Sequence, residues 1–593
     1  MAATTTYAAE EGLPRAPLPS LQDSCDRLLQ WSAPLLDAEQ LAETQAAVVA
    51  FLRPGSPAHR LQAALQREQD EGAGWLEGFW ASRYLGRRDR IAVNANYFFL
   101  LADSPLGQVE RAAALTRAAV DHKQRLDAEA VAPVRERDQV QSMEQNKYLF
   151  SATRIPGTEH DTDRTAYSAT EPGASRHRHV LVLSRGHAFR LEVLDHHDRP
   201  YPVERLAAGL QRVLAQSQDW APPSRALGHL TTQDRAQWAT DRAELLAGAP
   251  ENAAFLDQVE TALFCLCLDD VAPADTRAAC WQLLAGSGAN RWYDKSFSLI
   301  VAADGTAGLN GEHTHLDGTT VVGLIDALLA PGATETTPAA EGEPGVAALD
   351  VRLTAALAER VVAAAESFAD FTAGCATELV SFDHLGSAQL KSLGVSPDAF
   401  VQMAFQLAHQ RARGLVGSTY ESVATRQFWH GRTEAMRVVT PEVLTFVAAM
   451  DDPAVDPAGR VAALRAALAA HTARARECKQ GLAPEQHLWE LQLTQQRRGA
   501  ELGATEPLAL YHSPGWVVLR QDYLSTSSAP SQFTQYFGFG STSDRCIGVG
   551  YVLLPERFHL HLSTPRAVDQ QMQAFAAQLR SVVPELQSLL AGG

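Results

Sequence analysis

The sequence predicts an α+β protein whose strands fall into two clusters separated by long helices. Residues 177–194 change from helical to alternating periodicity around Arg185-Gly186, which predicts a β-hairpin. Residues 296–312 predict a second hairpin, with Asp304-Gly305 as its tight turn. Strands are expected again in four segments near the end of the chain: 515–527, 531–540, 545–554 and 556–563.

Apolar residues recur at helical spacing through most of the remaining chain. The first 75 residues read as helices, and long helical segments follow at 204–216, 235–248, 355–371, 396–412 and 458–478. An amphipathic helix is expected near 566–590. A stretch rich in Pro, Gly, Thr and Glu at about 328–348 reads as a linker. We therefore expect N-terminal helices at 1–75 that pack with the C-terminal domain, a first domain at 76–350 and a second at 351–593.

Composition excludes several classes of protein. The chain has 593 residues, with 51 Lys+Arg against 69 Asp+Glu, so its formal charge is −18. An acidic chain without a basic run is a poor binder of nucleic acids or anionic membranes. The sequence has no stretch of 18 or more apolar residues, so no membrane span is predicted. The N-terminus lacks the pattern of a signal peptide. We expect a cytoplasmic protein.

The seven cysteines do not suggest a disulfide framework. Cys265 and Cys267 form a C-x-C pair inside the apolar run 255–268, which we interpret as helical. Buried, inert thiols in a reducing compartment are the favoured interpretation of such a pair.

A histidine segment stands out at 311–318, where Gly311 and Gly318 bracket Glu312, His313, His315 and Asp317. A histidine with a carboxylate four residues later suits a general base, because imidazole titrates near neutrality and the carboxylate stabilises its charged form. Two other interpretations stay open from the residues alone. His313 and His315 could hold a metal ion on one strand face, or the segment could be a loop without chemical function.

A second motif is Ser525-Thr526-Ser527, which follows an expected strand and precedes Pro530. On a strand the two serines face one side and Thr526 the other, so two hydroxyls could point at one ligand. Hydroxyls that face a developing oxyanion are a known catalytic device. No G-x-S-x-G elbow surrounds the motif, so a serine nucleophile is not indicated.

Seven short motifs occur in a characteristic order, and together they resemble the choline/carnitine O-acyltransferase family. In chain order they are residues 290–295 (NRWYDK), the second hairpin, Glu312-His313, 396–408 (SPDAFVQMAFQLA), 419–422 (TYES), 431–434 (GRTE) and 524–530 (LSTSSAP). The resemblance runs from residue 18 to the C-terminal helix. It implies two domains with mixed sheets and flanking helices, each similar to chloramphenicol acetyltransferase, that enclose an active-site tunnel.

The resemblance also implies roles for individual residues. His313 matches the catalytic base, Asp317 its acidic partner, and Ser527 the hydroxyl that stabilises the oxyanion. Lys391, Asp398 and Ser387 match positions that contact coenzyme A. The acceptor-binding positions are matched by Tyr420, Thr433, Gln486, Ser525, Thr526 and Phe539, and the position that closes the acyl pocket is matched by Phe537.

Three of these positions, and also Gly311 beside the histidine, differ from the family pattern or from part of the family. Gln486 stands where carnitine-using members have the arginine that binds the substrate carboxylate, so we expect carnitine to be a poor acceptor. Ser387 replaces a lysine, so we expect weaker binding of the 3′-phosphate of coenzyme A. Phe537 argues for a short acyl group. Gly311 replaces a tyrosine beside the histidine, which suggests more room on the acceptor side.

The resemblance therefore implies an acyltransferase that moves a short acyl group from a coenzyme A or phosphopantetheine thioester directly to an alcohol, without an acyl-enzyme. Bound cofactors and metals are not implied, and a monomer is expected. Two alternatives stay open. The donor could be an acyl-carrier protein that delivers a biosynthetic acyl chain to a choline-like or polyol acceptor, or the chain could be an inactive relative that only binds acyl thioesters.

Overall fold

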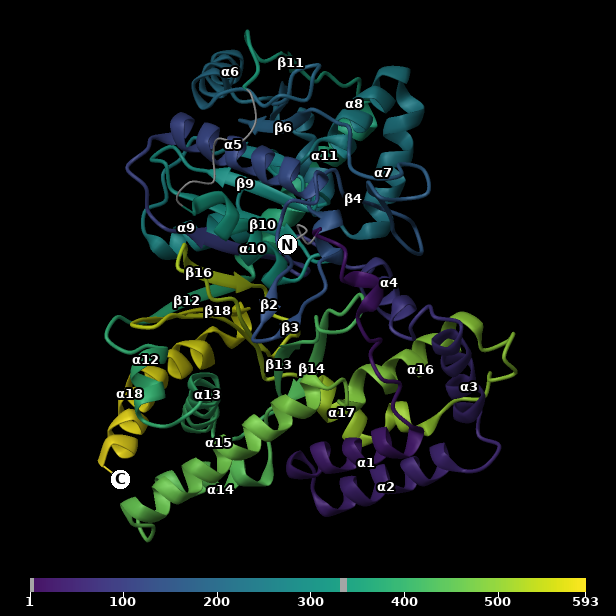
Figure 1. Cartoon of the computed structure of the whole chain (residues 1–593), viewed down its shortest axis with the longest axis vertical. Coiled ribbons are helices and arrows are strands. Elements are labelled where there is room, and N and C mark those ends of the chain that lie inside the picture. The colour runs from purple at the N-terminus through teal and green to yellow at the C-terminus, as the bar shows by residue number, and fades with distance from the viewer. Residues whose placement is uncertain (1–4, 331–338, 593) are drawn as a thin grey trace. The chain divides into compact units, whose positions relative to one another are not determined.

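The structure is a computed structural model that describes residues 5–330 and 339–592 (Figure 1). The chain forms two compact units. Of the described residues, unit 1 contains 5–11, 83–330, 339–377 and 529–540, and unit 2 contains 12–82, 378–528 and 541–592. The predicted boundaries at 75/76 and 350/351 differ from this division, because both units contain separate stretches of the chain.

Unit 1 is built on an eight-stranded mixed sheet in the order β11-β7-β6-β8-β9-β10-β1-β16. Its strands are β1 (Asn96–Leu101), β6 (His179–Ser184), β7 (His187–Glu192), β8 (Cys265–Leu268), β9 (Phe297–Val301), β10 (Ala307–Glu312), β11 (Val346–Ala348) and β16 (Thr534–Phe539). β6, β8 and β9 are parallel neighbours, and the other pairings are antiparallel. Short pairs β2–β3 (Arg135–Glu136, Gln139–Val140) and β4–β5 (Thr153–Ile155, Thr162–Arg164) lie outside this sheet.

The helices of unit 1 are α5 (Gln108–Asp127), α6 (Val203–Gln216), α7 (Arg235–Gly248), α8 (Pro250–Thr261), α9 (Thr276–Leu284), α10 (Gly318–Leu329) and α11 (Ala355–Ala373).

Both predicted hairpins are confirmed, as β6–β7 and β9–β10. In the first, Arg185 and Gly186 both have positive φ, which is the geometry of a type I′ turn.

The last strand of the unit 1 sheet comes from far along the chain. β16 pairs antiparallel with β1, so Tyr97 lies opposite Phe539 and Phe99 opposite Phe537. In Figure 1, β16 has the yellow of the C-terminal region, whereas β1 has the dark blue of the N-terminal third. This pairing brings Phe537 and Phe539 into the unit that contains His313.

Unit 2 is built on a six-stranded mixed sheet in the order β12-β18-β17-β15-β13-β14. Its strands are β12 (Cys375–Phe382), β13 (Thr419–Ala424), β14 (Thr433–Arg437), β15 (Leu524–Ser528), β17 (Ile547–Leu553) and β18 (Phe558–Pro565). β13, β15 and β17 run parallel. Each sheet therefore contains three adjacent parallel strands with antiparallel strands beside them, which confirms the predicted α+β class.

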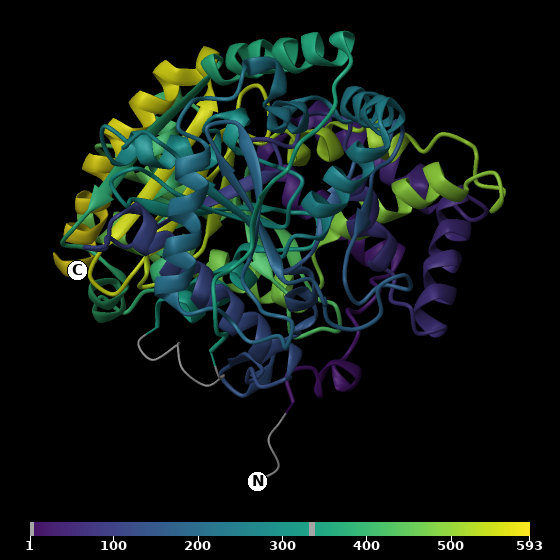
Figure 2. The same cartoon turned by 90° about the horizontal axis from the view of Figure 1, so that it is seen from above.

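The helices of unit 2 fall into two groups along the chain. The C-terminal ones are α12 (Ser387–Ser392), α13 (Pro397–Arg413), α14 (Pro441–Asp451), α15 (Pro457–Lys479), α16 (Pro484–Arg498), α17 (Pro514–Arg520) and α18 (Asp569–Gly592). α18 packs along α13 and β18. Figure 2 shows α18 as the yellow helix that leads to the C-terminus. The N-terminal ones are α1 (Leu21–Ser32), α2 (Ala38–Leu52) and α3 (Pro57–Asp70). α1 contacts α16 and α17, so these early helices belong to the same unit as the late ones. The chain passes from unit 2 to unit 1 within α4 (Glu77–Leu85).

Two secondary-structure predictions are wrong. Cys265 and Cys267 lie in β8 rather than in a helix. All four residues of β8 are buried, and an interior parallel strand reads as a continuous apolar run that periodicity cannot distinguish from a buried helix. The segment expected as a strand at 515–527 begins instead as α17, because Pro514 takes the first helical position and Ser513 caps the helix.

Two further features follow from the described residues. None of their helices is long and apolar enough to cross a membrane. The predicted linker at 328–348 lies partly outside the described residues, and its last part forms β11 at the edge of the unit 1 sheet.

Candidate active site

His313 follows directly on β10, the strand that lies between β9 and β1. The strand ends at Glu312, and the chain then turns into α10, whose N-cap residue is Asp317. This turn returns the Asp317 carboxylate to the histidine. Nδ1 of His313 lies 3.6 Å from Oδ1 of Asp317, which is an ion-pair distance rather than a hydrogen bond.

Gln145 holds Asp317 in place. Its Nε2 donates to Oδ2 of Asp317 at 2.7 Å, and its Oε1 accepts from the backbone N–H of Asp317 and from Thr320 Oγ1, both at 2.8 Å. Asp317 is buried and lies at the N-terminus of α10, where the helix dipole favours a negative charge. The carboxylate is therefore fixed on one side of the imidazole.

Two tyrosine rings contact the His313 ring. The ring centroids of Tyr84 and His313 are 4.9 Å apart, and that of Tyr97 lies 5.2 Å away in an edge-on arrangement. Tyr97 also donates from its hydroxyl to the carbonyl of Leu316 at 3.0 Å. Neither tyrosine belongs to a recognisable motif, so neither could be predicted as part of the site from the sequence.

Tyr97 also explains the glycine beside the histidine. It pairs with Gly311 across β1 and β10, and a Cβ on Gly311 would lie only 2.9 Å from a carbon of the Tyr97 ring. The space that we expected Gly311 to leave for the acceptor is thus filled by Tyr97.

A buried ion network supports the strand end before His313. Arg154 lies 3.3 Å from Glu312 and 2.6 Å from Asp161, and Arg235 also reaches Asp161 at 2.7 Å. Although burial opposes its ionisation, these two arginines hold the pKa of Asp161 below its usual value. Breaking such a buried pair on one side leaves an uncompensated charge, so this network constrains Glu312 and the turn that follows.

His315 has different partners from His313. Its Nε2 is hydrogen-bonded to Asp163, and its ring stacks on Tyr148 with centroids 4.2 Å apart. The hydrogen bond with His315 lowers the pKa of Asp163, so Asp163 favours its charged form. The strand has ended before His313, so the two histidines do not form the strand-face pair that a metal site would need.

An aromatic cluster lies next to Tyr97. Phe537 is buried, and its ring centroid lies 4.9 Å from that of Phe99, 5.9 Å from Phe539 and 6.3 Å from Tyr97. A Cβ on Gly318 would be about 4 Å from both Phe99 and Phe537. Two phenylalanines rather than one therefore fill the space near the start of α10.

Three of the acceptor positions predicted in unit 2, Tyr420, Thr433 and Ser525, share one face of its sheet. Tyr420 on β13 pairs with Ser525 on β15, and the register puts Ser527 on the same face. β14 pairs antiparallel with β13 so that Thr433 and Arg437 also belong to this face. The guanidinium of Arg437 lies over the Tyr420 ring, 5.5 Å from its centroid, as this register requires.

Thr526, which we predicted as an acceptor position, lies on the opposite face. Its hydroxyl donates to the carbonyl of Tyr420 at 2.8 Å and accepts from Gln402 Nε2 at 2.9 Å. Thr526 and Gln402 are fully buried, so this face of β15 packs on α13. The geometry gives Thr526 a structural role in holding β15 against β13 and α13.

Gln486 belongs to the first turn of α16, beside the edge strand β14. Its Nε2 donates to the backbone carbonyl of Thr433 at 2.7 Å. The preceding residue, Glu485, accepts from Arg437 at 2.7 Å, and Arg437 also binds Asp522. Arg437 is thus the arginine that β14 contributes to this face, and two carboxylates neutralise it.

Two of the predicted coenzyme A positions, Ser387 and Lys391, belong to the short helix α12. Lys391 is exposed, and the backbone N–H of Ser387 donates to the carbonyl of Leu554. The third position, Asp398, lies in the first turn of α13. Its Oδ1 accepts from the hydroxyl of Tyr551 at 2.6 Å.

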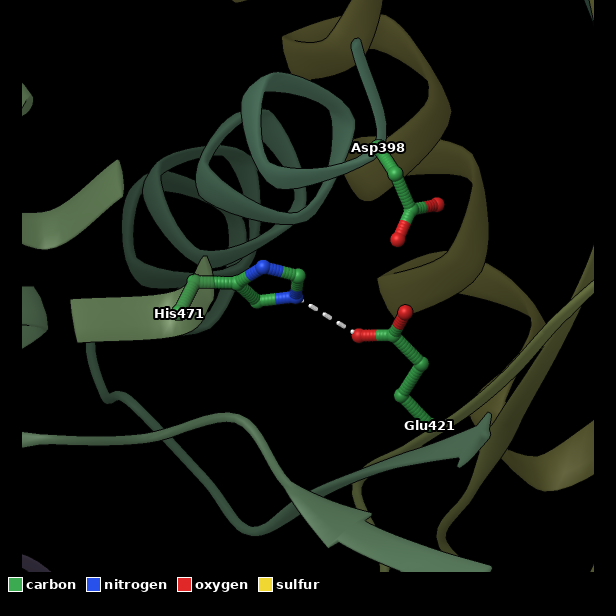
Figure 3. Close-up of side chains that lie close together, drawn as sticks. All are labelled: Asp398, Glu421 and His471. Atoms are coloured by element: carbon green, nitrogen blue, oxygen red, sulfur yellow. Dashed lines mark hydrogen bonds and ion pairs between the residues drawn. The ribbon is translucent and has the colours of Figure 1, made fainter. Parts of the chain in front are cut away.

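Asp398, which is partly buried, also lies in a cluster with the buried residues Glu421 and His471 (Figure 3). One potential ligand atom from each residue lies within 4.8 Å of the others, and the two carboxylates face each other. Glu421 and His471 already share a hydrogen bond of 2.8 Å, so we interpret the cluster as a proton-sharing one.

The ionisation of this cluster supports that interpretation. Burial, together with the nearby Asp398, raises the pKa of Glu421 to about 8. Burial opposes the charged form of His471, but the nearby Glu421 raises the pKa of His471 above its usual value. At neutral pH the cluster therefore holds more protons than the same residues would in water.

The predicted site residues thus fall into two groups, one in each unit. Unit 1 brings together His313, Asp317, Phe537 and Phe539, and unit 2 brings Tyr420, Thr433, Ser525 and Ser527 onto one sheet face.

Comparison with known proteins now identifies the family. The family model for choline/carnitine O-acyltransferases matches residues 16–581. The chain belongs to the choline/carnitine O-acyltransferase family. It is therefore an acyltransferase, and coenzyme A thioesters are the co-substrates of this family.

Relatives in the family differ in acyl group and acceptor. The chain is 30% identical to bovine mitochondrial carnitine O-palmitoyltransferase 2, with 92% of this chain and 87% of that protein covered. It is 29% identical to human choline O-acetyltransferase, which it covers to 76%, and 28% identical to rat carnitine O-acetyltransferase, which it covers to 89%. The family therefore establishes acyl transfer, whereas the substrates must be argued from the residues of this chain.

Proposed function

We propose that this acyltransferase moves a short acyl group from coenzyme A to an alcohol other than carnitine, with His313 as the general base. The observation that carries this proposal is the His313–Asp317 pair, which Gln145 holds in place. The proposed base atom is Nε2, across the ring from the nitrogen that faces Asp317. An imidazole with its other nitrogen beside a carboxylate can take up a proton near neutral pH.

The proposed reaction is a direct transfer. Nε2 of His313 accepts the proton of the acceptor hydroxyl, whose oxygen attacks the thioester carbonyl. The tetrahedral oxyanion accepts a hydrogen bond from the hydroxyl of Ser527. As the C–S bond breaks, the thiolate of coenzyme A takes the proton back from the imidazolium. The ester is released, and the histidine returns to its neutral form.

Two residues support the proposed substrates: Gln486 for the acceptor and Phe537 for the acyl group. Gln486 carries no charge to compensate a buried carboxylate, and leaving one uncompensated costs about 3–5 kcal/mol. Arg437 does not replace the missing arginine, because it is engaged by Glu485 and Asp522. Phe537 and Phe99 fill the space where a long acyl chain would need room.

A donor and acceptor panel tests this function. Purified protein is incubated with acetyl-, octanoyl- or palmitoyl-CoA and with choline, carnitine or a neutral polyol, while free thiol is followed and the ester is identified by mass spectrometry. We expect thiol release that depends on an added alcohol and is fastest with acetyl-CoA. Release that is fastest with palmitoyl-CoA and carnitine would contradict the proposed substrates.

A further inference from the structure

Gln486 presents an unpartnered hydrogen-bond acceptor. The residue is 1% exposed, and within residues 5–330 and 339–592 its Oε1 has no hydrogen-bond partner. A buried polar oxygen without a partner is destabilising, and such atoms are uncommon in folded proteins. Oε1 of Gln486 therefore has the capacity to accept a hydrogen bond that the described chain does not supply.

The orientation of the amide is set by its other end. Nε2 donates to the carbonyl of Thr433 at 2.7 Å. Turning the amide over would bring two oxygens together at this distance, which is repulsive. The nitrogen must therefore face Thr433, and the oxygen must face the other way.

The surroundings give this oxygen its place in the acceptor site. Thr433 and Tyr420 share one face of the unit 2 sheet, and the first turn of α16 contacts that face through the Glu485–Arg437 pair. Both charges of this pair are already matched, and the Gln486 oxygen adds a partial negative charge close to Thr433. A carboxylate would be repelled there, whereas a polar hydrogen would be attracted.

We propose that Oε1 of Gln486 accepts a hydrogen bond from the acceptor substrate. The acceptor is then an alcohol that carries a second polar hydrogen, on a hydroxyl, amide or ammonium group, where carnitine has its carboxylate. This inference rests on the proposed function, and it goes further because it states what replaces the carboxylate.

Three matched acceptors test this inference: carnitine, its primary amide and its methyl ester. All three share the secondary hydroxyl and the trimethylammonium group, but only the amide offers polar hydrogens at the position in question. We expect kcat/KM for the amide to exceed that for the ester by roughly 5- to 100-fold, the range that a lost hydrogen bond to a buried acceptor produces. Carnitine is expected to be no better than the ester.

Three variants test whether Gln486 causes the preference for the amide over the ester. Gln486→Leu should bring the amide-to-ester ratio close to one, whereas Gln496→Leu, at an exposed position of the same helix, should leave it unchanged. Gln486→Arg should reverse the preference toward carnitine. Thermal midpoints of all variants show whether each one folds, and Gln486→Arg keeps the test decisive if Gln486→Leu does not.

The binding of the same three compounds, measured by calorimetry, separates the two claims. If the amide binds more tightly than the ester but no compound is acylated, the proposed function fails, and only the hydrogen bond between the ligand and Gln486 is supported. If acyl transfer proceeds and the ester is as good an acceptor as the amide, the inference is overturned and the proposed function stands. An amide-to-ester ratio that persists in Gln486→Leu also overturns it.

Discussion

Asp317 and Gln145 form two hydrogen bonds with each other, one through each side of the Gln145 amide. These bonds fix the carboxylate 3.6 Å from His313, although Gln145 is 168 residues away in the sequence from His313. The position of the acid beside the base thus depends on a residue with no catalytic signature.

Replacing Asp317 tests this arrangement. Asp317→Asn keeps a group that can bind Gln145 but removes the charge beside the imidazole, so we expect kcat to fall about 10- to 100-fold. Gln145→Leu should lower kcat less, because the carboxylate remains but is no longer fixed. Steady-state kinetics at saturating acetyl-CoA measures both. Full activity in Asp317→Asn would show that the carboxylate is only structural.

Ser527→Ala tests the proposed oxyanion donor. Removing one such donor lowers kcat by about 100- to 1,000-fold in enzymes of this general type, and KM should change little. Ser528→Ala is the matched control, because Ser528 lies next along β15 on the other face of the sheet. Equal losses in the two variants would indicate damage to β15 rather than loss of an oxyanion donor.

The preference of the enzyme for short acyl chains should depend on the rings of Phe537 and Phe99. Phe537→Ala is expected to raise the ratio of kcat/KM for octanoyl-CoA over acetyl-CoA, and Phe99→Ala with Phe537→Ala should raise it further because Phe99 packs against the same ring. Phe98→Leu is the control, since Phe98 is buried on the opposite face of β1. If wild-type protein already prefers palmitoyl-CoA, Phe537 does not close the acyl pocket.

The Glu421 cluster predicts a pH-dependent stability. Because the pKa of Glu421 is about 8, well above its usual value, the folded protein binds more protons than the unfolded chain between about pH 4.5 and 8. Stability must then fall as pH rises through this window, by at most about 1.4 kcal/mol per pH unit for one group.

Glu421→Gln is the variant that checks this. It should show a flatter dependence of the thermal midpoint on pH between 6 and 8, whereas Glu442→Gln, at an exposed position on α14, should follow wild type. Parallel curves for wild type and Glu421→Gln would contradict the proton-sharing interpretation.

Local chemistry made much of the fold predictable. Arg185-Gly186 and Asp304-Gly305 marked both hairpins correctly because turns of this kind need residues that tolerate their backbone geometry. The buried strand around Cys265 was missed, since burial on both faces removes the alternation that identifies strands.

The site was less predictable than the fold. The spacing of His313 and Asp317 sufficed to suggest a pair, because four residues can span one turn. Gln145, Tyr84 and Tyr97 could not be found from spacing, since tertiary packing alone brings them to the histidine. The alternation of β15 already separated Thr526 from Ser525 and Ser527, and the structure shows what holds Thr526 on its own face.

The most direct test of the account is alcohol-dependent release of coenzyme A by His313→Ala, measured beside wild type and His315→Ala. His315 is the matched control, because it is a nearby histidine whose partners are Asp163 and Tyr148. We predict that His313→Ala loses about 100- to 10,000-fold in kcat, the contribution of a general base, while His315→Ala stays within about threefold of wild type. Release at the wild-type rate by a folded His313→Ala would contradict the proposed mechanism.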